Sequence, residues 1–201
     1  MITLLEHFIS SCDLTGITNI GEEKLTVHEY RDHIMTVVNL SVIQNKAKGK
    51  NIVSLTAFNP RYANPGVKGL TDGIFGGRHF NSGWLGYQGP DMIVEIDLGN
   101  AEKVHKVSMN FLRDFVSWIF LPEEVKVELS ADGKNYREVS NIKNILTDRR
   151  FGVEPVYHSL EFQQAETRFI KITALSMKIC PEWHRGAGQP SWIFCDEIIV
   201  E

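Results

Sequence analysis

The sequence has few cysteines and no long apolar run, and both shortages exclude classes of protein. It holds 3 cysteines in 201 residues and no Cys-x-x-Cys pair, which argues against a disulfide framework and a structural zinc site. Cys180 and Cys195 could face each other across a hairpin, but their apolar context favours two buried free thiols. No stretch approaches the roughly 20 apolar residues of a membrane span. The first residues show neither the basic region nor the clean apolar region of an export signal.

Excess positive charge is also missing. The chain has 21 Lys and Arg against 25 Asp and Glu, a formal net charge of −4. The basic residues are scattered, so they indicate no nucleic-acid partner, which would need clustered Lys and Arg to neutralise phosphates. Apolar spikes backed by basic residues, the combination that binds a lipid surface, do not occur either.

The motifs of common enzymes do not occur. There is no Gly-x-Ser-x-Gly elbow, no His-Glu-x-x-His pair and no glycine loop of the phosphate-binding kind. A glycosidase needs two carboxylates opposed across a cleft, and no pattern singles out such a pair here. The sequence therefore favours a binding domain without catalytic residues over an enzyme.

Alternation of apolar and polar residues dominates the chain from residue 50 onward. Strands are expected at 51–57, 91–98, 103–112, 124–130, 136–139, 156–162, 168–174 and 192–200. The turn Ala131-Asp-Gly-Lys134 is typical of a hairpin connection. Several short strands with turns between them and no long helical pattern predict an all-β protein, an antiparallel β-sandwich.

The first 48 residues differ in character. They suggest a short helix at 1–9, strand-like segments at 23–30 and 33–43, and a small hinge at 46–50. We interpret residues 1–48 as an N-terminal arm: the tail of a preceding domain, or extra strands laid against the sandwich. The sandwich itself is expected over 49–201.

An ordered set of motifs carries a family resemblance. The set comprises Leu70-Thr-Asp-Gly73, Trp84-Leu-Gly-Tyr87, Ile96-Asp-Leu-Gly99, Trp118-Ile-Phe-Leu-Pro122, Leu129-Ser-Ala-Asp-Gly-Lys-Asn-Tyr136, Arg168-Phe-Ile-Lys-Ile172 and Trp192-Ile-Phe-Cys-Asp-Glu-Ile198. In this order they resemble the discoidin family, the coagulation factor V/VIII C-type domain with its galactose-binding-like carbohydrate-binding modules. Cys180-Pro-Glu-Trp-His184 further resembles the C-terminal modules of Bacteroides-type β-hexosaminidases (chitobiases). The resemblance implies a galactose-binding-like jelly-roll β-sandwich, here with a short N-terminal extension.

The resemblance also implies a structural Ca²⁺ where an early loop meets the last strand. The matching positions are Asp72 and Glu197, with backbone carbonyls of Leu70 and Gly77 completing the shell. Asp-Gly turns and late glutamates supply the oxygen ligands that Ca²⁺ prefers. Asn81-Ser82 stand where the family often has threonine, which leaves a third side-chain ligand open. The alternative is that Asp72 is an ordinary turn residue and Glu197 a solvated strand end.

Three loops carry residue types that hold sugars, which are bound by aromatic faces and forked polar groups. The candidate ligand-binding residues are Arg78, His79, Phe80, Arg113, Trp118, Trp183, His184 and Arg185. Each also has a structural alternative, such as a salt bridge of Arg113 with Asp114 or of Arg185 with Glu182. Trp84 and Trp192 follow strand alternation and are expected in the core.

Two functions from different classes follow. The first is a non-catalytic carbohydrate-binding module, an ancillary domain of a glycoside hydrolase that binds galactose- or N-acetylhexosamine-type glycans. The second is a structural or protein-interaction domain packed on the catalytic domain of its parent chain, with no sugar bound. The resemblance implies an extracellular or periplasmic location. If Trp118 and Trp183 line an exposed concave surface, the first function is favoured; if neighbouring loops bury both, the second is favoured.

Overall fold

The computed structural model describes residues 14–19, 24–31, 34–41, 44–63, 66–77, 79–144 and 152–201. The chain divides into two compact units, Met1–Gln44 and Asn45–Glu201. The division falls a few residues before the expected boundary, because the backbone from Asn45 to Lys50 already bonds to the second unit. Lys46 N–H donates to the Val200 carbonyl, and Gly49 N–H donates to the Thr71 carbonyl.

The first unit contains one antiparallel sheet. Its strands are β1 (Leu14–Asn19), β2 (Lys24–Arg31) and β3 (Ile34–Ser41), in the order β1-β2-β3. The two strand-like segments seen in the sequence correspond to β2 and β3, whereas β1 was not expected. The short helix expected at 1–9 lies outside the described residues.

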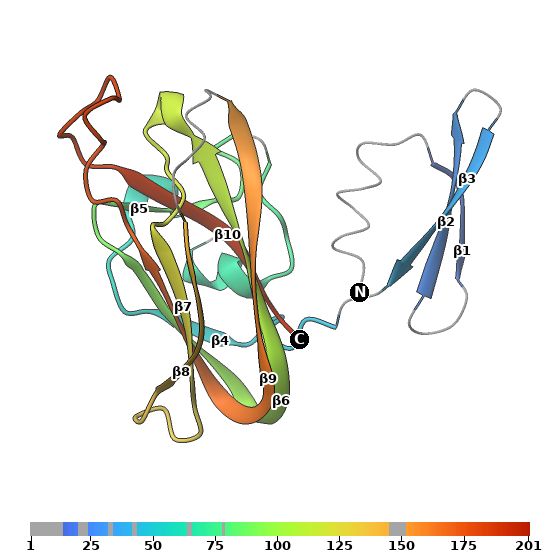
Figure 1. Ribbon diagram of the computed structural model, residues 1–201. Helices are drawn as coiled ribbons and strands as arrows, with labels where there is room; N and C mark the ends of the chain where they lie inside the picture. Colours follow the sequence, from blue (N-terminus) through green and yellow to red (C-terminus); the bar gives the residue numbers. More distant parts are fainter. Residues whose placement is uncertain are drawn as a thin grey trace. The chain divides into compact units, whose positions relative to one another are not determined.

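The second unit is a β-sandwich (Figure 1). Its strands are β4 (Asn51–Ser54), β5 (Leu85–Gln88), β6 (Met92–Asp114), β7 (Glu124–Ser130), β8 (Arg137–Lys143), β9 (Val153–Leu175) and β10 (Trp192–Val200). They hydrogen-bond in the order β5-β10-β6-β9-β7-β8, and β4 pairs with β6. All these pairings are antiparallel, which confirms the expected fold class. Short 3₁₀ helices η1 (Pro60–Tyr62), η2 (Val67–Thr71) and η3 (Phe115–Ser117) lie in the connections.

The strands β6 and β9 are 23 residues each and pair along most of their length. The register shifts between Asp97 and Glu102 and again between Val104 and Lys106. These irregularities bend both strands, because a bulge increases the local twist and turns the strand. One long pair therefore contributes to both layers of the sandwich. Among the described residues, no helix is long and apolar enough to cross a membrane.

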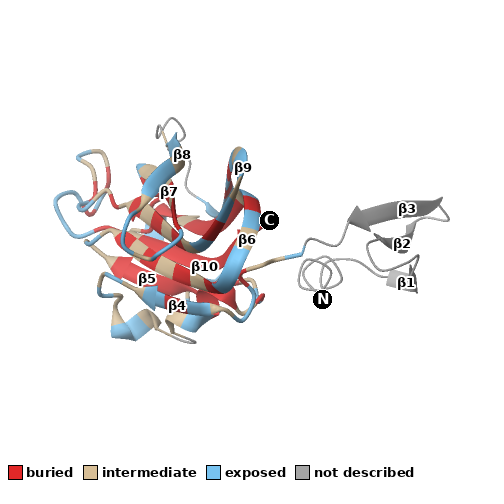
Figure 2. Cartoon of the chain, turned by 90° about the horizontal axis from the view of Figure 1, so that it is seen from below, coloured by how far each residue is buried: buried red, intermediate tan, exposed pale blue. Residues whose placement is uncertain are grey.

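The core follows the alternation of the sequence. Every second residue from Met92 to Leu98 is buried, and the same holds from Val125 to Leu129 and from Ile170 to Ala174. Burying one such side chain contributes roughly 1.5–3 kcal/mol. In β10 eight of nine residues are buried, because β5 and β6 flank the strand and loops cover it (Figure 2). Cys180 and Cys195 are buried free thiols, as expected.

One glycine in β5 is required by close packing. A Cβ on Gly86 would lie 2.3 Å from Cε1 of Phe194, its register partner on β10. We expect Gly86→Ala to lower the free energy of unfolding by about 1–3 kcal/mol, because the buried ring cannot move aside without strain. Gly152→Ala is the matched control, since no atom of the residues that the structure describes lies within 4 Å of its Cβ position. Urea unfolding of both variants measures the difference, and equal stability of the two would contradict this packing.

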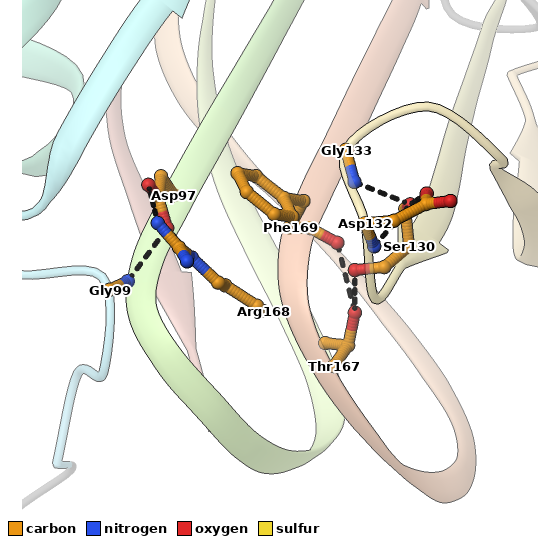
Figure 3. A network of polar contacts seen from close by, with 8 residues as sticks. All are labelled: Asp97, Gly99, Ser130, Asp132, Gly133, Thr167, Arg168 and Phe169. Carbon is orange, nitrogen blue, oxygen red and sulfur yellow. Dashed lines mark hydrogen bonds and ion pairs between the residues drawn. The ribbon is translucent and has the colours of Figure 1, made fainter.

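The bend of β6 and β9 is stabilised by polar contacts (Figure 3). The guanidinium of Arg168 donates to both oxygens of Asp97 at 2.7 and 2.8 Å, and Gly99 N–H donates to the same carboxylate. Thr167 Oγ1 donates to the Ser130 carbonyl at 2.8 Å. The hydrogen bonds from Arg168 lower the pKa of Asp97 to about 2.

This lowered pKa predicts how the pair responds to acid. In the unfolded chain the Asp97 carboxyl has a pKa of about 3.9. The stabilisation from its pair with Arg168 is therefore present above that pH and is lost as the pH falls through about 2. We expect Arg168→Met to lower the free energy of unfolding slightly at pH 7, since the pair is solvent-exposed, and to lower it less near pH 2. Urea titrations at both pH values measure this. An equal loss at both would assign the effect to packing of Arg168 on the Phe169 ring, 4.8 Å away.

Candidate functional site

A small aromatic pocket lies among the connections between strands. It has a volume of about 210 Å³ and is lined by Tyr62, Phe80, Ser117, Ile119, Trp192 and Phe194. These residues come from η1, from the loop before β5, from η3 and the residues after it, and from β10. The pocket is smaller than the roughly 300–1,000 Å³ of drug-sized sites. It suits a single small ring better than a long ligand.

Tyr62 is at the centre of the aromatic lining. Its ring centroid lies 5.2 Å from that of Trp192, 5.0 Å from Phe194 and 5.9 Å from Phe80. Phe194 is 1% exposed, whereas Tyr62, Phe80 and Trp192 are only partly buried. The pocket therefore has a buried floor and partly exposed aromatic walls. Such walls can stack against the C–H face of an uncharged ring.

Polar groups surround this lining. Ser117 lines the pocket, and the exposed His79 ring lies 5.8 Å from Phe80. The guanidinium of Arg61 lies 5.4 Å from the Tyr62 ring. These groups can hydrogen-bond to hydroxyls at the edge of a ligand, which is how a mostly apolar site gains orientation.

The backbone fixes the pocket wall formed by η3 and β10. The Asp114 carboxylate accepts a hydrogen bond from Ser117 N–H at 3.3 Å, and Trp118 adopts the left-handed conformation with φ 65°. Trp192 N–H then donates to the Trp118 carbonyl, and Phe120 N–H donates to the Trp192 carbonyl. Because of these bonds, Ser117 and Trp192 line the same pocket.

A second aromatic cluster holds two of the residues expected to contact a ligand. Trp118 and Trp183 are partly buried against Phe115, Phe120 and Cys180. The Trp183 ring lies edge-on to Phe115 at 5.5 Å. Because neighbouring loops pack on both tryptophans, this part of the surface fits the structural function better than a sugar-binding platform.

His184 joins two loops and is 3% exposed. Its Nε2 donates to the Phe115 carbonyl at 2.6 Å, and Gly186 N–H donates to its Nδ1 at 3.0 Å. The ring proton is therefore on Nε2, and both nitrogens are engaged within the protein. This geometry gives His184 a structural role and leaves neither nitrogen for a sugar hydroxyl.

The arginines expected at the site have protein partners or lie outside the description. Arg113 forms an ion pair with Glu154. Arg185 is exposed and donates to the Val116 carbonyl at 2.6 Å, and within the described part of the chain it forms no ion pair with Glu182. Arg78 lies outside the described residues.

Of the predicted residues, the pocket includes Phe80, with His79 beside it. Sequence reasoning missed Tyr62 and assigned Trp192 to the core. Trp84, 2% exposed, is in the core as expected. The Asn59-Pro-Arg-Tyr62 turn was the available signal for Tyr62, since Asn59 caps η1 by accepting from Arg61 N–H.

The predicted cation site lies where the loop after η2 meets β10. A bulge between Cys195 and Ile198 places Asp196 and Glu197 opposite a single residue of β6. Glu197 accepts from Gly73 N–H and from the Asn45 amide, both at 3.0 Å. Asp196 accepts from Gly76 N–H at 2.6 Å. Loop and strand are therefore joined by hydrogen bonds to carboxylates.

The predicted calcium ligands do not assemble into a closed shell. Asp72 accepts from Ile74 N–H at 2.7 Å in a local turn, and the Gly77 carbonyl accepts from the Trp84 indole at 2.8 Å. Leu70 is buried, 1% exposed. Among the described residues, no three His, Cys, Asp or Glu are grouped so as to hold a metal ion. Ca²⁺ takes six to eight oxygens. The calcium ion stays a prediction, and the arrangement around Asp72 and Glu197 fits it poorly.

Burial and charge perturb the two acids of the bulge. Burial raises the pKa of Glu197 to about 8, and the Gly73 N–H acts against that shift. The charges of Asp72 and Asp196 also raise it, whereas the Lys48 ammonium lowers it. Burial likewise raises the pKa of Asp196 to about 7. Its Oδ1 is buried and accepts no hydrogen bond from the part of the chain that the structure describes.

The chain matches one protein family and is similar in fold to several solved structures. The model of the F5/8 type C domain matches residues 54–194, well over half of the chain. CpGH89CBM32-5 from Clostridium perfringens, solved in complex with GalNAc-β-1,3-galactose, is 17% identical with a TM-score of 0.50, covering 78% of this chain and 99% of that one. No curated protein matches the chain.

Two further solved structures are similar at lower TM-scores. Chitosan-binding module 1 of a Paenibacillus sp. IK-5 chitosanase/glucanase is 13% identical, with a TM-score of 0.49, covering 79% of this chain and 98% of that one. The fucose-binding module SpX-3 of Streptococcus pneumoniae is 15% identical, with a TM-score of 0.48 and the same coverage. At 17% identity, the likeness to the C. perfringens structure shows a similar fold and nothing further about this chain.

Proposed function

Because the chain belongs to the F5/8 type C domain family, we propose that it is a non-catalytic carbohydrate-binding module. In this proposal the aromatic pocket of Tyr62, Phe80 and Trp192 receives the terminal sugar of a glycan. The observation that carries the proposal is this pocket: partly exposed aromatic walls, a volume suited to one ring, and polar groups at its edge.

The sugar class is the finer part of the proposal. We propose a terminal galactose or N-acetylhexosamine, because the similar C. perfringens structure contains GalNAc-β-1,3-galactose. Aromatic walls suit an uncharged hexose, whose axial C–H groups form an apolar face. Association with the catalytic domain of a glycoside hydrolase, outside the cell or in the periplasm, belongs to the same proposal. The module would hold that enzyme near its substrate.

A second candidate function has one observation in its favour. Trp118 and Trp183, the loop tryptophans expected to form a platform, pack on Phe115 and Phe120 instead. If the loops serve as an interface with a parent domain, the module is structural and binds no sugar. The pocket of Tyr62 and Trp192 is what makes the carbohydrate function the better supported of the two.

Isothermal titration calorimetry separates the two functions. The full chain is titrated with galactose, N-acetylgalactosamine, N-acetylglucosamine and GalNAc-β-1,3-galactose, with mannitol as an acyclic control. The carbohydrate function predicts saturable heat at one site for at least one cyclic sugar. Flat traces from a chain that unfolds cooperatively would leave the structural function as the better account.

A further inference from the structure

The segment before β4 ties the loop after η2 to the end of β10. The Asn45 amide donates to Glu197 Oε1 and to the Ile198 carbonyl, both at 3.0 Å. Its Oδ1 accepts from Ala47 N–H at 2.9 Å and from Val200 N–H at 3.0 Å. The turn at 45–50 is therefore fixed beside the carboxylates of the bulge, and it lies outside the matched range 54–194.

This turn carries a lysine to the same junction. A Cβ on Gly73 would lie 2.7 Å from Lys48 Nζ and 2.8 Å from its Cε. The lysine side chain therefore lies across the backbone of Gly73. Gly73 in turn donates its N–H to Glu197 Oε2 at 3.0 Å. The Lys48 ammonium and the Glu197 carboxyl group thus both lie beside Gly73. The φ of +83° at Gly73 also disfavours any other residue at that position.

Three acidic side chains gather at the junction, those of Asp72, Asp196 and Glu197. The charges of Asp72 and Asp196 both act on Glu197, which is 1% exposed. Buried charge is costly unless an opposite charge accompanies it. Among the cations that the structure describes near Glu197, Lys48 is the one whose charge acts on it.

We propose that the Lys48 ammonium is the resident cation of this junction and holds the loop at 70–77 on β10 without a metal ion. In this proposal Lys48 supplies the positive charge at the junction of loop and strand that the family resemblance assigns to Ca²⁺. The amide of Asn45 and the N–H of Gly73 complete the hydrogen bonding of Glu197. Folding of the sandwich is then independent of divalent cations.

Thermal unfolding of the full chain tests the proposal in two ways. Wild type is expected to keep the same Tm in excess CaCl₂ and in EDTA, whereas a metal bound only by the folded state would raise the Tm. Lys48→Met is expected to lower the Tm by about 2–4 °C. Lys48→Arg, which keeps the charge, is expected to stay near wild type. Lys68→Met is the matched control, since Lys68 is an exposed lysine of η2.

A double-mutant cycle ties the effect to the carboxylate. In a Glu197→Gln background, Lys48→Met is expected to cost less, because the neutral side chain no longer needs a counter-charge. Three results would overturn the proposal: a wild-type Tm that falls in EDTA and recovers with CaCl₂, a Lys48→Met variant no less stable than Lys68→Met, or an undiminished cost in the Glu197→Gln background. If Lys48→Met fails to fold while Lys48→Arg folds normally, the requirement for charge is supported.

Discussion

Replacement of Trp192 by alanine is expected to weaken sugar binding at least about tenfold, a loss of about 1.4 kcal/mol in binding free energy. Trp192 is a partly exposed wall of the pocket, and its ring lies 5.2 Å from Tyr62 and 5.6 Å from Phe194. Removing it deletes the stacking surface and loosens the two rings beside it. Calorimetry with the best sugar of the panel measures the change, after circular dichroism has shown that the variant is folded.

Trp183→Ala is the matched control for this experiment. Like Trp192, Trp183 is a partly buried tryptophan near the C-terminal end of the sequence. It packs on Phe115 and Phe120 and does not line the pocket. We expect its removal to lower stability and to leave affinity within about twofold of wild type. If Trp183→Ala abolished binding and Trp192→Ala did not, the platform would be the second aromatic cluster, and the pocket assignment would be wrong.

Loss of the His184 ring is expected to destabilise the protein by about 2–4 kcal/mol. His184→Ala leaves the Phe115 carbonyl and the Gly186 N–H without their present partners in a buried place. It also removes an edge-on ring contact of 5.3 Å with Phe120. Unfolding in urea measures the loss, and the slope of the transition shows whether unfolding stays two-state.

His105→Ala is the control for the effect of His184. His105 is exposed on β6, so we expect a change within about 0.5 kcal/mol. A His184 variant as stable as the His105 variant would mean that the two loops are held together without the imidazole. In that case His184 would again be a candidate for contacting the sugar.

The fold could be predicted because its signal is local and repeated. Alternation in β7 and in the second half of β9 places Val127 and Ile172 in the core, and the same pattern places Met92 and Val94 there from β6. The sequence split β6 and β9 into shorter strands because the alternation breaks at their bends, near Gly99 and Ala165. Hydrogen bonds continue through such a bend, and periodicity cannot show that.

The candidate site was harder to predict because it depends on contacts between distant segments. Trp192 has the spacing of a core residue, yet it lines a pocket because Tyr62 and Phe80 meet it from other loops. His184 has the appearance of a loop residue, yet the Phe115 carbonyl binds its ring. Lys48 looked like part of a hinge, and only the turn at 45–50 places it beside Gly73. Sequence spacing contains none of these three distances.

The location of the bound sugar tests the account most directly. The chain has 4 tryptophans, whose indole N–H groups give separate signals in a ¹H–¹⁵N correlation spectrum. Titration with the sugar that binds in calorimetry is expected to shift the Trp192 indole signal. The Trp84 indole, bonded to the Gly77 carbonyl, and the Trp183 indole are expected to stay in place. Shifts at Trp183 and Trp118 with an unchanged Trp192 would contradict the assignment of the binding site to the pocket.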